Sequence, residues 1–262
     1  TSGVSEQESV ARTLGVAGGV AVLCSLLVSS AVLWLRPIQL AYASIERNRA
    51  VVEAAGLIEP GAELDEREIV ERFLDLEIAI VDLDAGTFSD AVLPTTYDFR
   101  AAINDPDQTR PIPDDLNIAN LGRRPLYLPV YLLRDGANIE RIVLPIYGQG
   151  MWAMIHGFIS IGADFATIEG VAFYEHGETP GIGDRFLELD WLEQWQGQRF
   201  YDDSRRLVFG IGDGGSSAAA NGGIDAITGA TVTASAIEDL VRYWLGDDGF
   251  GPFLAARRGE AQ

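Results

Sequence analysis

The chain has 262 residues, 47% of them apolar, and it carries 39 acidic against 19 basic side chains for a formal net charge of −20. This length and apolar content allow one or two folded domains with a substantial core, and they exclude a disordered tail. The single cysteine, Cys24, excludes a disulfide scaffold. Nucleic acid is excluded as a partner, because a strongly acidic chain without a basic stripe repels a phosphate backbone.

The first predicted element is a membrane-spanning helix. The 23 residues between Arg12 and Arg36 carry no charge. As a helix they reach about 34 Å, enough for a hydrocarbon core of about 30 Å. A cleaved signal peptide is the rival interpretation, but its apolar region is usually only about 7 to 15 residues long. With Trp34 and Arg36 as interfacial anchors, we expect residues 1–36 to form a single transmembrane anchor.

The charges beside this helix bear on its orientation. Arg36, Arg47 and Arg49 follow the apolar run, whereas only Arg12 precedes it. Taken alone, the positive-inside rule keeps the following domain in the cytoplasm, but the rule is weak for long domains. Orientation therefore stays open at this point.

Residues 37–124 are expected to form a subdomain of helices and loops. The segments 38–57 and 64–75 have helical patterns, the first closed by Gly56. In residues 77–88, apolar and polar side chains alternate, as is typical of a strand. Residues 90–124 are rich in Pro, Asp and Asn without a clear period, which predicts a long surface loop.

Residues 125–262 change character and predict an α+β domain. Four runs rich in β-branched and aromatic residues, typical of an antiparallel sheet, occupy 126–134, 139–148, 152–162 and 167–176. A helix over 184–195, a strand over 207–211, a Gly/Ser/Ala loop over 212–223 and a last helix over about 232–245 follow. Because strands and helices are grouped, we expect a twisted antiparallel sheet flanked by helices.

The usual catalytic constellations are missing from the sequence. Two His and one Cys do not make a metal site, and no G-x-S-x-G elbow supports a serine hydrolase. His156 lies in a strand pattern, where we expect a structural role. We therefore expect no catalytic side chain and no metal ligand.

One short motif does carry chemistry. DAITGAT, residues 225–231, precedes the last predicted helix and places Thr231 at its start. Free N–H groups and the positive end of the helix dipole suit a phosphate there, and Gly229 and Ala230 let it approach the backbone. From the residues alone two interpretations remain open: the Thr231 hydroxyl caps the helix, or it is itself esterified.

Two further segments are candidates for contact with a flat ligand. EHGETPGIGDR, residues 175–185, is a glycine-rich loop after the last long strand. YGQGMW, residues 147–152, places Tyr147 and Trp152 around two glycines, as a wall for a ring system. An ordinary glycine-rich turn is the alternative for each.

Together and in this order, PIYGQGMWAMIHGF, FYEHGETPGIG and DAITGAT behind one N-terminal membrane helix resemble the C subunits of the bacterial Na⁺-translocating NADH:quinone oxidoreductases. The resemblance is strongest over residues 125–246, and it makes the last domain an FMN-binding one. It implies FMN joined by a phosphodiester bond to Thr231. The expected cofactor-binding residues, by their positions in the motifs, are Trp152, Glu178, Thr179, Pro180, Gly181, Ile182, Asp225, Thr228, Gly229, Ala230 and Thr231.

The resemblance also implies a cellular setting. It places the chain in the bacterial inner membrane with the flavin domain in the periplasm, against the charge bias. It implies a flavin transferase for maturation. Within the complex, it implies single-electron transfer by FMN between iron–sulfur membrane subunits and the FMN-bearing B subunit, on the way to ubiquinone.

Three alternatives remain. The G subunit of the related ferredoxin:NAD⁺ oxidoreductase complex shares the ETPG and [ST]GAT motifs, but it is shorter than this chain over 50–124. A membrane-anchored binding or scaffold protein requires only that Thr231 be a helix cap. A flavin-dependent reductase acting alone would turn over NADH without partners.

Overall fold

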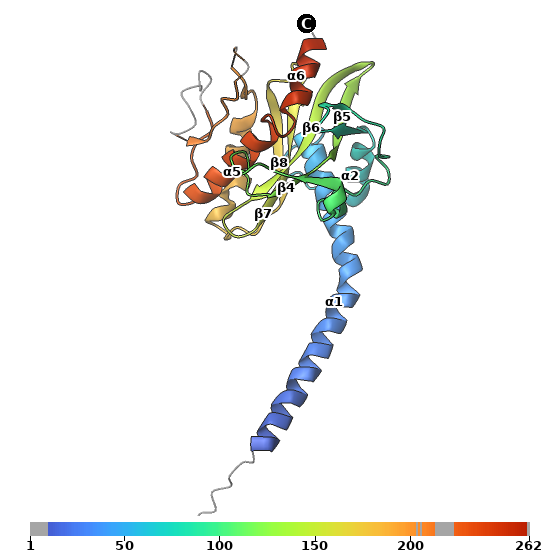
Figure 1. Cartoon of the computed structure of the whole chain (residues 1–262), viewed down its shortest axis with the longest axis vertical. Coiled ribbons are helices and arrows are strands. Elements are labelled where there is room, and N and C mark those ends of the chain that lie inside the picture. Colours follow the sequence, from blue (N-terminus) through green and yellow to red (C-terminus); the bar gives the residue numbers. More distant parts are fainter. Residues whose placement is uncertain (1–9, 203, 205, 213–222, 261–262) are drawn as a thin grey trace, which may run out of the picture. The chain divides into compact units, whose positions relative to one another are not determined.

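The structure is a computed structural model, and it describes residues 10–202, 204, 206–212 and 223–260 (Figure 1). Two compact units are distinguished, residues 1–45 and residues 46–262. The expected Gly/Ser/Ala loop falls mostly on residues 213–222, which lie outside the described residues.

Helix α1 runs from Val10 to Ala54 without interruption and contains Pro37. The helix predicted over 38–57 is present as the continuation of the apolar helix, which passes through Pro37 at the cost of one missing N–H group. The predicted end is confirmed: Gly56 donates its N–H to the carbonyl of Glu53, and Leu57 donates to Val52. Within the described ranges, α1 is the one helix long and apolar enough to cross a membrane.

The second unit is built on a six-stranded sheet in the order β2-β1-β5-β6-β7-β8. Every neighbouring pair is antiparallel, so the expected α+β fold with an antiparallel sheet is confirmed. The strands are β1 (Glu77–Asp82), β2 (Thr87–Phe88), β5 (Tyr127–Asp135), β6 (Asn138–Gln149), β7 (Met154–Gly162) and β8 (Ile168–Glu175).

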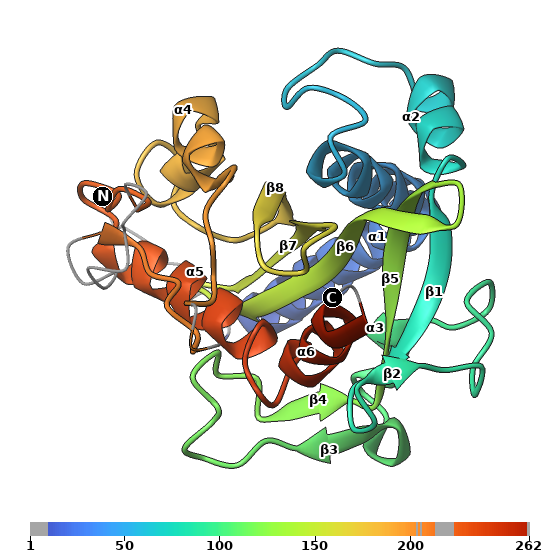
Figure 2. The same ribbon diagram turned by 90° about the horizontal axis from the view of Figure 1, so that it is seen from above.

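Each face of the sheet covers a separate apolar cluster. The larger cluster joins the sheet to α5 (Thr231–Trp244) and α6 (Gly251–Glu260), which lie on one side of it (Figure 2). The smaller cluster joins the other face to Ala50, Val51 and Ala54 at the end of α1. Because successive side chains of a strand point to opposite faces, neighbouring residues of β6 and β7 serve different clusters.

Residues 90–124 are more ordered than the predicted surface loop. They contain α3 (Phe99–Ala102), a 3₁₀ turn (Pro106–Gln108), β3 (Thr109–Pro111) and the start of β4 (Arg123–Pro125), which pairs with β3. Arg124 is 1% exposed and forms ion pairs with Asp84 and Asp248. These partners are remote in sequence, so local composition gives no sign of a buried cation.

Other elements are partly as predicted. Helix α2 (Glu66–Phe73) begins at a capping box between Asp65 and Glu68. The expected helix over 184–195 is instead a chain of short turns: a 3₁₀ turn (Gly183–Leu187), α4 (Leu189–Leu192) and a second 3₁₀ turn (Glu193–Trp195). The extended backbone of Glu188 breaks it. The expected strand over 207–211 makes only isolated bridges at its two ends.

A row of aromatic side chains crosses the sheet over strands β5 to β8. Ring centroids are 5.7 Å apart between Tyr131 and Phe158, 5.3 Å between Phe158 and Tyr174, and 6.0 Å between Tyr174 and His156. The row continues from His156 to Tyr147 at 5.5 Å. The structural role expected for His156 thus has a concrete form, because its imidazole packs as a member of this row.

Burial of His156 makes stability depend on pH. Desolvation lowers the pKa of His156 to about 4, with the charge of Arg100 acting in the same direction and that of Glu175 opposing it. The unfolded chain, with a His pKa of about 6.5, binds the proton first as pH falls. The free energy of unfolding should therefore fall between about pH 6.5 and 4, by on the order of 3 kcal/mol from this group. His156→Phe, which keeps an aromatic ring, should remove that part of the loss.

Urea unfolding of the full chain in detergent at several pH values measures this difference. Carboxylates also titrate in the window, so the informative quantity is the difference between wild type and variant. Equal losses of stability in the two proteins would show that His156 is not buried in its neutral form.

Candidate functional site

Two of the segments singled out by sequence, and the helix that follows the third, meet at the buried carboxylate of Glu178, which is 4% exposed. One oxygen accepts a hydrogen bond of 2.7 Å from the hydroxyl of Thr233, in the first turn of α5. The other accepts one of 3.2 Å from the backbone N–H of Trp152, in the β6–β7 turn. A buried carboxylate needs donors. Here they come from both neighbouring segments, so Glu178 joins the loop, the hairpin and the helix.

Glycines make room for this close approach. A Cβ atom on Gly150 would lie 2.6 Å from a carboxylate oxygen of Glu178, and one on Gly177 would lie 2.5 Å from the Cβ of Ala153. Such contacts are too short for real atoms. The glycines of the YGQGMW and EHGETPGIGDR segments are therefore required by packing at these two positions.

Residues Thr179–Ile182 form an exposed turn directly after Glu178. Ile182 donates its N–H to the carbonyl of Thr179, at 3.2 Å, and Gly181 has φ +75°. Pro180 before a glycine of positive φ is the sequence of a type II turn. All four residues are exposed, and an added Cβ on Gly181 would meet nothing. The turn thus offers accessible backbone to a flat ligand.

The motif DAITGAT ends at the first residue of α5. Ala230 holds the N-cap position, so Thr231 is inside the helix and does not cap it. The Thr231 side chain is exposed, and Gly229, with φ +84°, has open space where a Cβ would be. The interpretation of Thr231 as the N-cap is therefore wrong for this structure. Its hydroxyl stands beside the unpaired N–H groups of a helix start, where an anion is stabilised.

The short turns over 183–195 hold this motif in place. Trp191 donates its indole N–H to the carbonyl of Asp225 at 2.9 Å, and Gln194 accepts the N–H of Asp225 at 2.7 Å. Arg185 donates to the carbonyl of Thr228 at 3.2 Å. These side chains line a cavity of about 200 Å³ together with Asp225 and Thr228. The carboxylate of Asp225 is exposed, so only the backbone of that residue is tied down.

Exposed apolar side chains lie on the segments that meet at Glu178. Trp152 is 64% exposed, Ile182 54%, Val232 57% and Met151 51%. Large apolar side chains left in water beside a built polar centre indicate a binding surface for a ligand or a partner.

The predicted site residues are brought together in part. Glu178 and Trp152 are joined by a hydrogen bond, and Glu178 reaches the helix that begins at Thr231. The expected wall of Tyr147 and Trp152 does not form, because Tyr147 is 2% exposed and packs on His156 and Trp244. The two residues lie in different elements: Tyr147 is inside β6, whereas Trp152 is in the turn between β6 and β7.

Four supporting residues are not found from the sequence: Arg185, Trp191, Gln194 and Thr233. The first three lie in the segment expected to be one helix, whose regular faces would not point them at residues 225–228. The sequence does contain a signal for Thr233. Thr233 lies on the apolar face of the predicted helix, where a buried hydroxyl needs a hydrogen-bond partner.

The arrangement suits a phosphate group and a flat ring better than a metal ion. No group of three or more His, Cys, Asp or Glu side chains able to hold a metal ion occurs in the described part of the chain. An exposed hydroxyl, an open glycine and a helix start favour a phosphate group, and the exposed turn with Trp152 and Ile182 offers a surface to a flat ring.

Comparison with known proteins agrees with this chemistry. Residues 150–246 match the family described as an FMN-binding domain. The chain is similar to the C subunit of the Na(+)-translocating NADH-quinone reductase of Vibrio alginolyticus, with 33% identity over 97% of both chains. It is 38% identical to the corresponding protein of Pseudomonas aeruginosa, over 98% of this chain and 100% of the relative. A crystal structure of Shewanella oneidensis NqrC matches with TM-score 0.70 and 30% identity, covering 84% of this chain and 99% of that one.

The hydrogen bond from Thr233 to Glu178 should support the fold of the site measurably. Thr233→Val keeps the shape of the side chain but leaves a buried carboxylate oxygen without its donor. The free energy of unfolding should fall by about 1.5–3 kcal/mol. Urea unfolding of the full chain in detergent measures it, and Thr233→Ser, which keeps the hydroxyl, is the matched control. A Val variant as stable as the Ser variant would contradict this role of the bond.

Proposed function

The chain belongs to the family of C subunits of the Na(+)-translocating NADH-quinone reductase, and from this premise we propose that it carries FMN as a phosphodiester on Thr231 and relays single electrons. Membership makes it a flavoprotein subunit of a membrane-anchored oxidoreductase complex. The full-length similarity favours the C subunit over the shorter G subunit of the related ferredoxin:NAD⁺ complex.

The observation that carries the covalent linkage is the state of the Thr231 hydroxyl. It is exposed at the first residue of α5, while Ala230 holds the capping position. A phosphate joined to this oxygen lies at the positive end of the helix, next to free backbone N–H groups. The open space at Gly229 leaves room for the rest of the ester.

The remaining motif residues hold the rest of the cofactor. We assign the ring to the exposed turn Thr179–Ile182 and to Trp152, whose relative positions are fixed through Glu178. Arg185 and Trp191 fix the backbone of residues 225–228 and so the direction from which the ester leaves Thr231.

No acid or base of the polypeptide is needed for this function. When bound, FMN itself accepts and releases electrons, and the protein supplies position and electrostatics. Buried Glu178 places one fixed carboxylate behind the turn, and its two donors keep it from moving toward the cofactor.

The proposed partners follow from family membership. A flavin transferase attaches FMN at Thr231, the iron–sulfur membrane subunits exchange electrons with it, and the FMN-bearing B subunit does so on the way to ubiquinone. The exposed apolar side chains Met151, Trp152, Ile182 and Val232 support an accessible cofactor. The site therefore suits exchange with more than one partner.

Thr231→Ala should give a folded, membrane-bound chain without covalent flavin. The intact mass of wild type should exceed the sequence mass by that of FMN less one water, and the variant should match its sequence mass. Thr95→Ala is the matched control, because Thr95 is an exposed threonine outside the three motifs. It should keep the added mass.

Fluorescence after denaturing electrophoresis gives a second readout of the same variants. A fluorescent band or an added flavin mass in Thr231→Ala would overturn the linkage. A wild-type chain that is isolated from its own complex and lacks both the fluorescent band and the added mass would also overturn the linkage.

The soluble domain should lie in the periplasm of the bacterial inner membrane. In a Cys24→Ser background, Asp135→Cys places one thiol at the exposed end of β5, next to the β5–β6 turn. A membrane-impermeant maleimide should label it when only the outer membrane is permeable. The unsubstituted Cys24→Ser chain controls for background labelling. Labelling only after the inner membrane is broken would place the domain in the cytoplasm, as the charge bias favours.

A further inference from the structure

A second cavity, of about 320 Å³, lies beside the β6–β7 hairpin, and none of the described residues that line it belongs to α5. Tyr147 and His156 pair across the two strands, and their stacked rings form one wall. The lining shares no residue with Glu178, with the turn Thr179–Ile182 or with the start of α5 at Thr231.

The polar lining of this cavity is basic and neutral. Arg100 and Arg123 contribute two guanidinium groups, and Asn104 and Asn120 contribute two carboxamides. Arg123 also donates from Nε and Nη2 to Thr109 and Pro106, so its Nη1 is the group that remains for a ligand. None of the described residues that line it carries a carboxylate, although the chain as a whole has a net charge of −20. The nearest compensating group is Glu175, which pairs with Arg100 at 2.6 Å from outside the lining. A cavity of this composition favours an anion.

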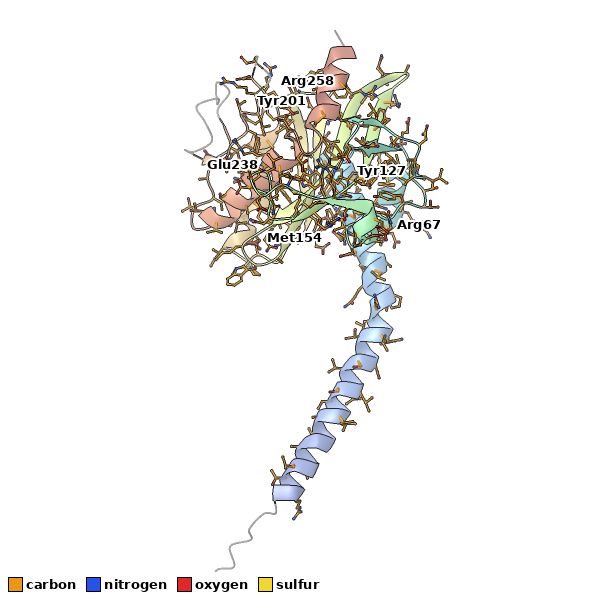
Figure 3. All side chains as sticks on the ribbon, in the orientation of Figure 1. Arg67, Tyr127, Met154, Tyr201, Glu238 and Arg258 are labelled. Atoms are coloured by element: carbon orange, nitrogen blue, oxygen red, sulfur yellow. The ribbon has the colours of Figure 1, made fainter. Side chains whose placement is uncertain are left out.

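Two lining residues keep buried donors without partners. The hydroxyl of Tyr147 and the Nε of Arg100 are both buried and make no hydrogen bond within the described structure. Buried polar atoms are nearly always paired, so unpaired donors in the wall of a cavity indicate a ligand that pairs them. Met154, labelled in Figure 3, adds an apolar side chain to the lining.

We propose that this cavity binds a small organic anion, a single aromatic ring carrying one carboxylate or phosphate group. The anionic group pairs with Arg100 and Arg123 and accepts from the Tyr147 hydroxyl. The ring lies against the stacked side chains of Tyr147 and His156 and against Met154. The volume of about 320 Å³ is at the lower end of the range of about 300–1,000 Å³ for small-molecule sites, which fits a ligand with one ring.

Burial keeps His156 in its neutral form above about pH 4, since desolvation lowers its pKa to that value. Neutral imidazole offers one donor and one acceptor. The cations of the site at neutral pH are thus the two arginines.

Calorimetric titration of the full chain in a neutral detergent tests the site, with phenyl phosphate and benzoate as probes and benzyl alcohol as the uncharged control. One of the two anions should bind one to one with a Kd below about 1 mM, and benzyl alcohol at least about tenfold more weakly. Tighter binding of phenyl phosphate identifies a phosphate ester as the natural class, and tighter binding of benzoate a carboxylate.

Two variants test the named contacts. Tyr147→Phe removes only a hydroxyl that has no partner in the fold, so stability should be unchanged while binding weakens by about fivefold or more. Arg123→Gln should weaken binding about tenfold. Arg134→Gln is the matched control, because it removes the same charge from an exposed strand end outside the cavity. Its affinity should equal that of wild type.

The outcomes separate this proposal from the proposed linkage at Thr231. Thr231→Ala should bind the anion as wild type does, and loss of binding there would show that the cavity belongs to the cofactor site. No saturable binding of either anion would overturn the proposal. Equal affinity in wild type, Tyr147→Phe and Arg123→Gln would overturn it as well, and thermal unfolding of each variant verifies that the fold is retained.

Discussion

The candidate site depends on one buried carboxylate. Glu178 lies in a loop, yet it is almost wholly removed from water. Among the described residues, the hydroxyl of Thr233 and the N–H of Trp152 offset the cost of burying its oxygens. Each donor comes from a different element. A displacement of α5 or of the β6–β7 turn by about one ångström would leave a buried oxygen unpaired, which costs about 1–3 kcal/mol. Compensation of this charge therefore fixes three segments relative to one another.

This constraint determines where Thr231 stands. Thr231 and Thr233 lie in the same helical turn, but Thr233 is 1% exposed and faces Glu178 whereas Thr231 is exposed. Two residues along a helix correspond to a rotation of about 200°, so fixing one hydroxyl inward turns the other outward. The hydroxyl that the proposed linkage needs is exposed because a neighbouring hydroxyl is held inside.

The strands and the last long helix were predictable because their side chains follow a simple period. β5 to β8 alternate or run apolar between turn residues, and α5 carries a regular apolar face. Segment 184–195 has a similar number of apolar residues, but three short turns bury Phe186, Trp191 and Trp195 without a single helix axis. The spacing of apolar residues alone does not distinguish one helix from three short turns.

The buried charges were not predictable, for a different reason. Arg124 owes its place to Asp84 and Asp248, and Glu178 owes its place to Thr233, 55 residues later. These are pairings between remote segments, and no local window contains both partners. The motif residues were identifiable because turn chemistry at Pro180 and Gly181 and the helix start after Gly229 are local properties. The hydrogen bonds of Glu178 that join these motifs were not identifiable from the sequence.

The proposed covalent attachment accounts for the openness of the site. A ligand held by contacts alone normally has about 70–90% of its surface buried, whereas here the turn Thr179–Ile182 and the side chains of Trp152 and Ile182 remain exposed. On the proposed linkage, one bond makes rebinding intramolecular, so retention no longer requires enclosure. An electron carrier gains from this, because a ring left at the surface can be approached by both donor and acceptor. The rigid Glu178 centre then keeps an open site in one geometry.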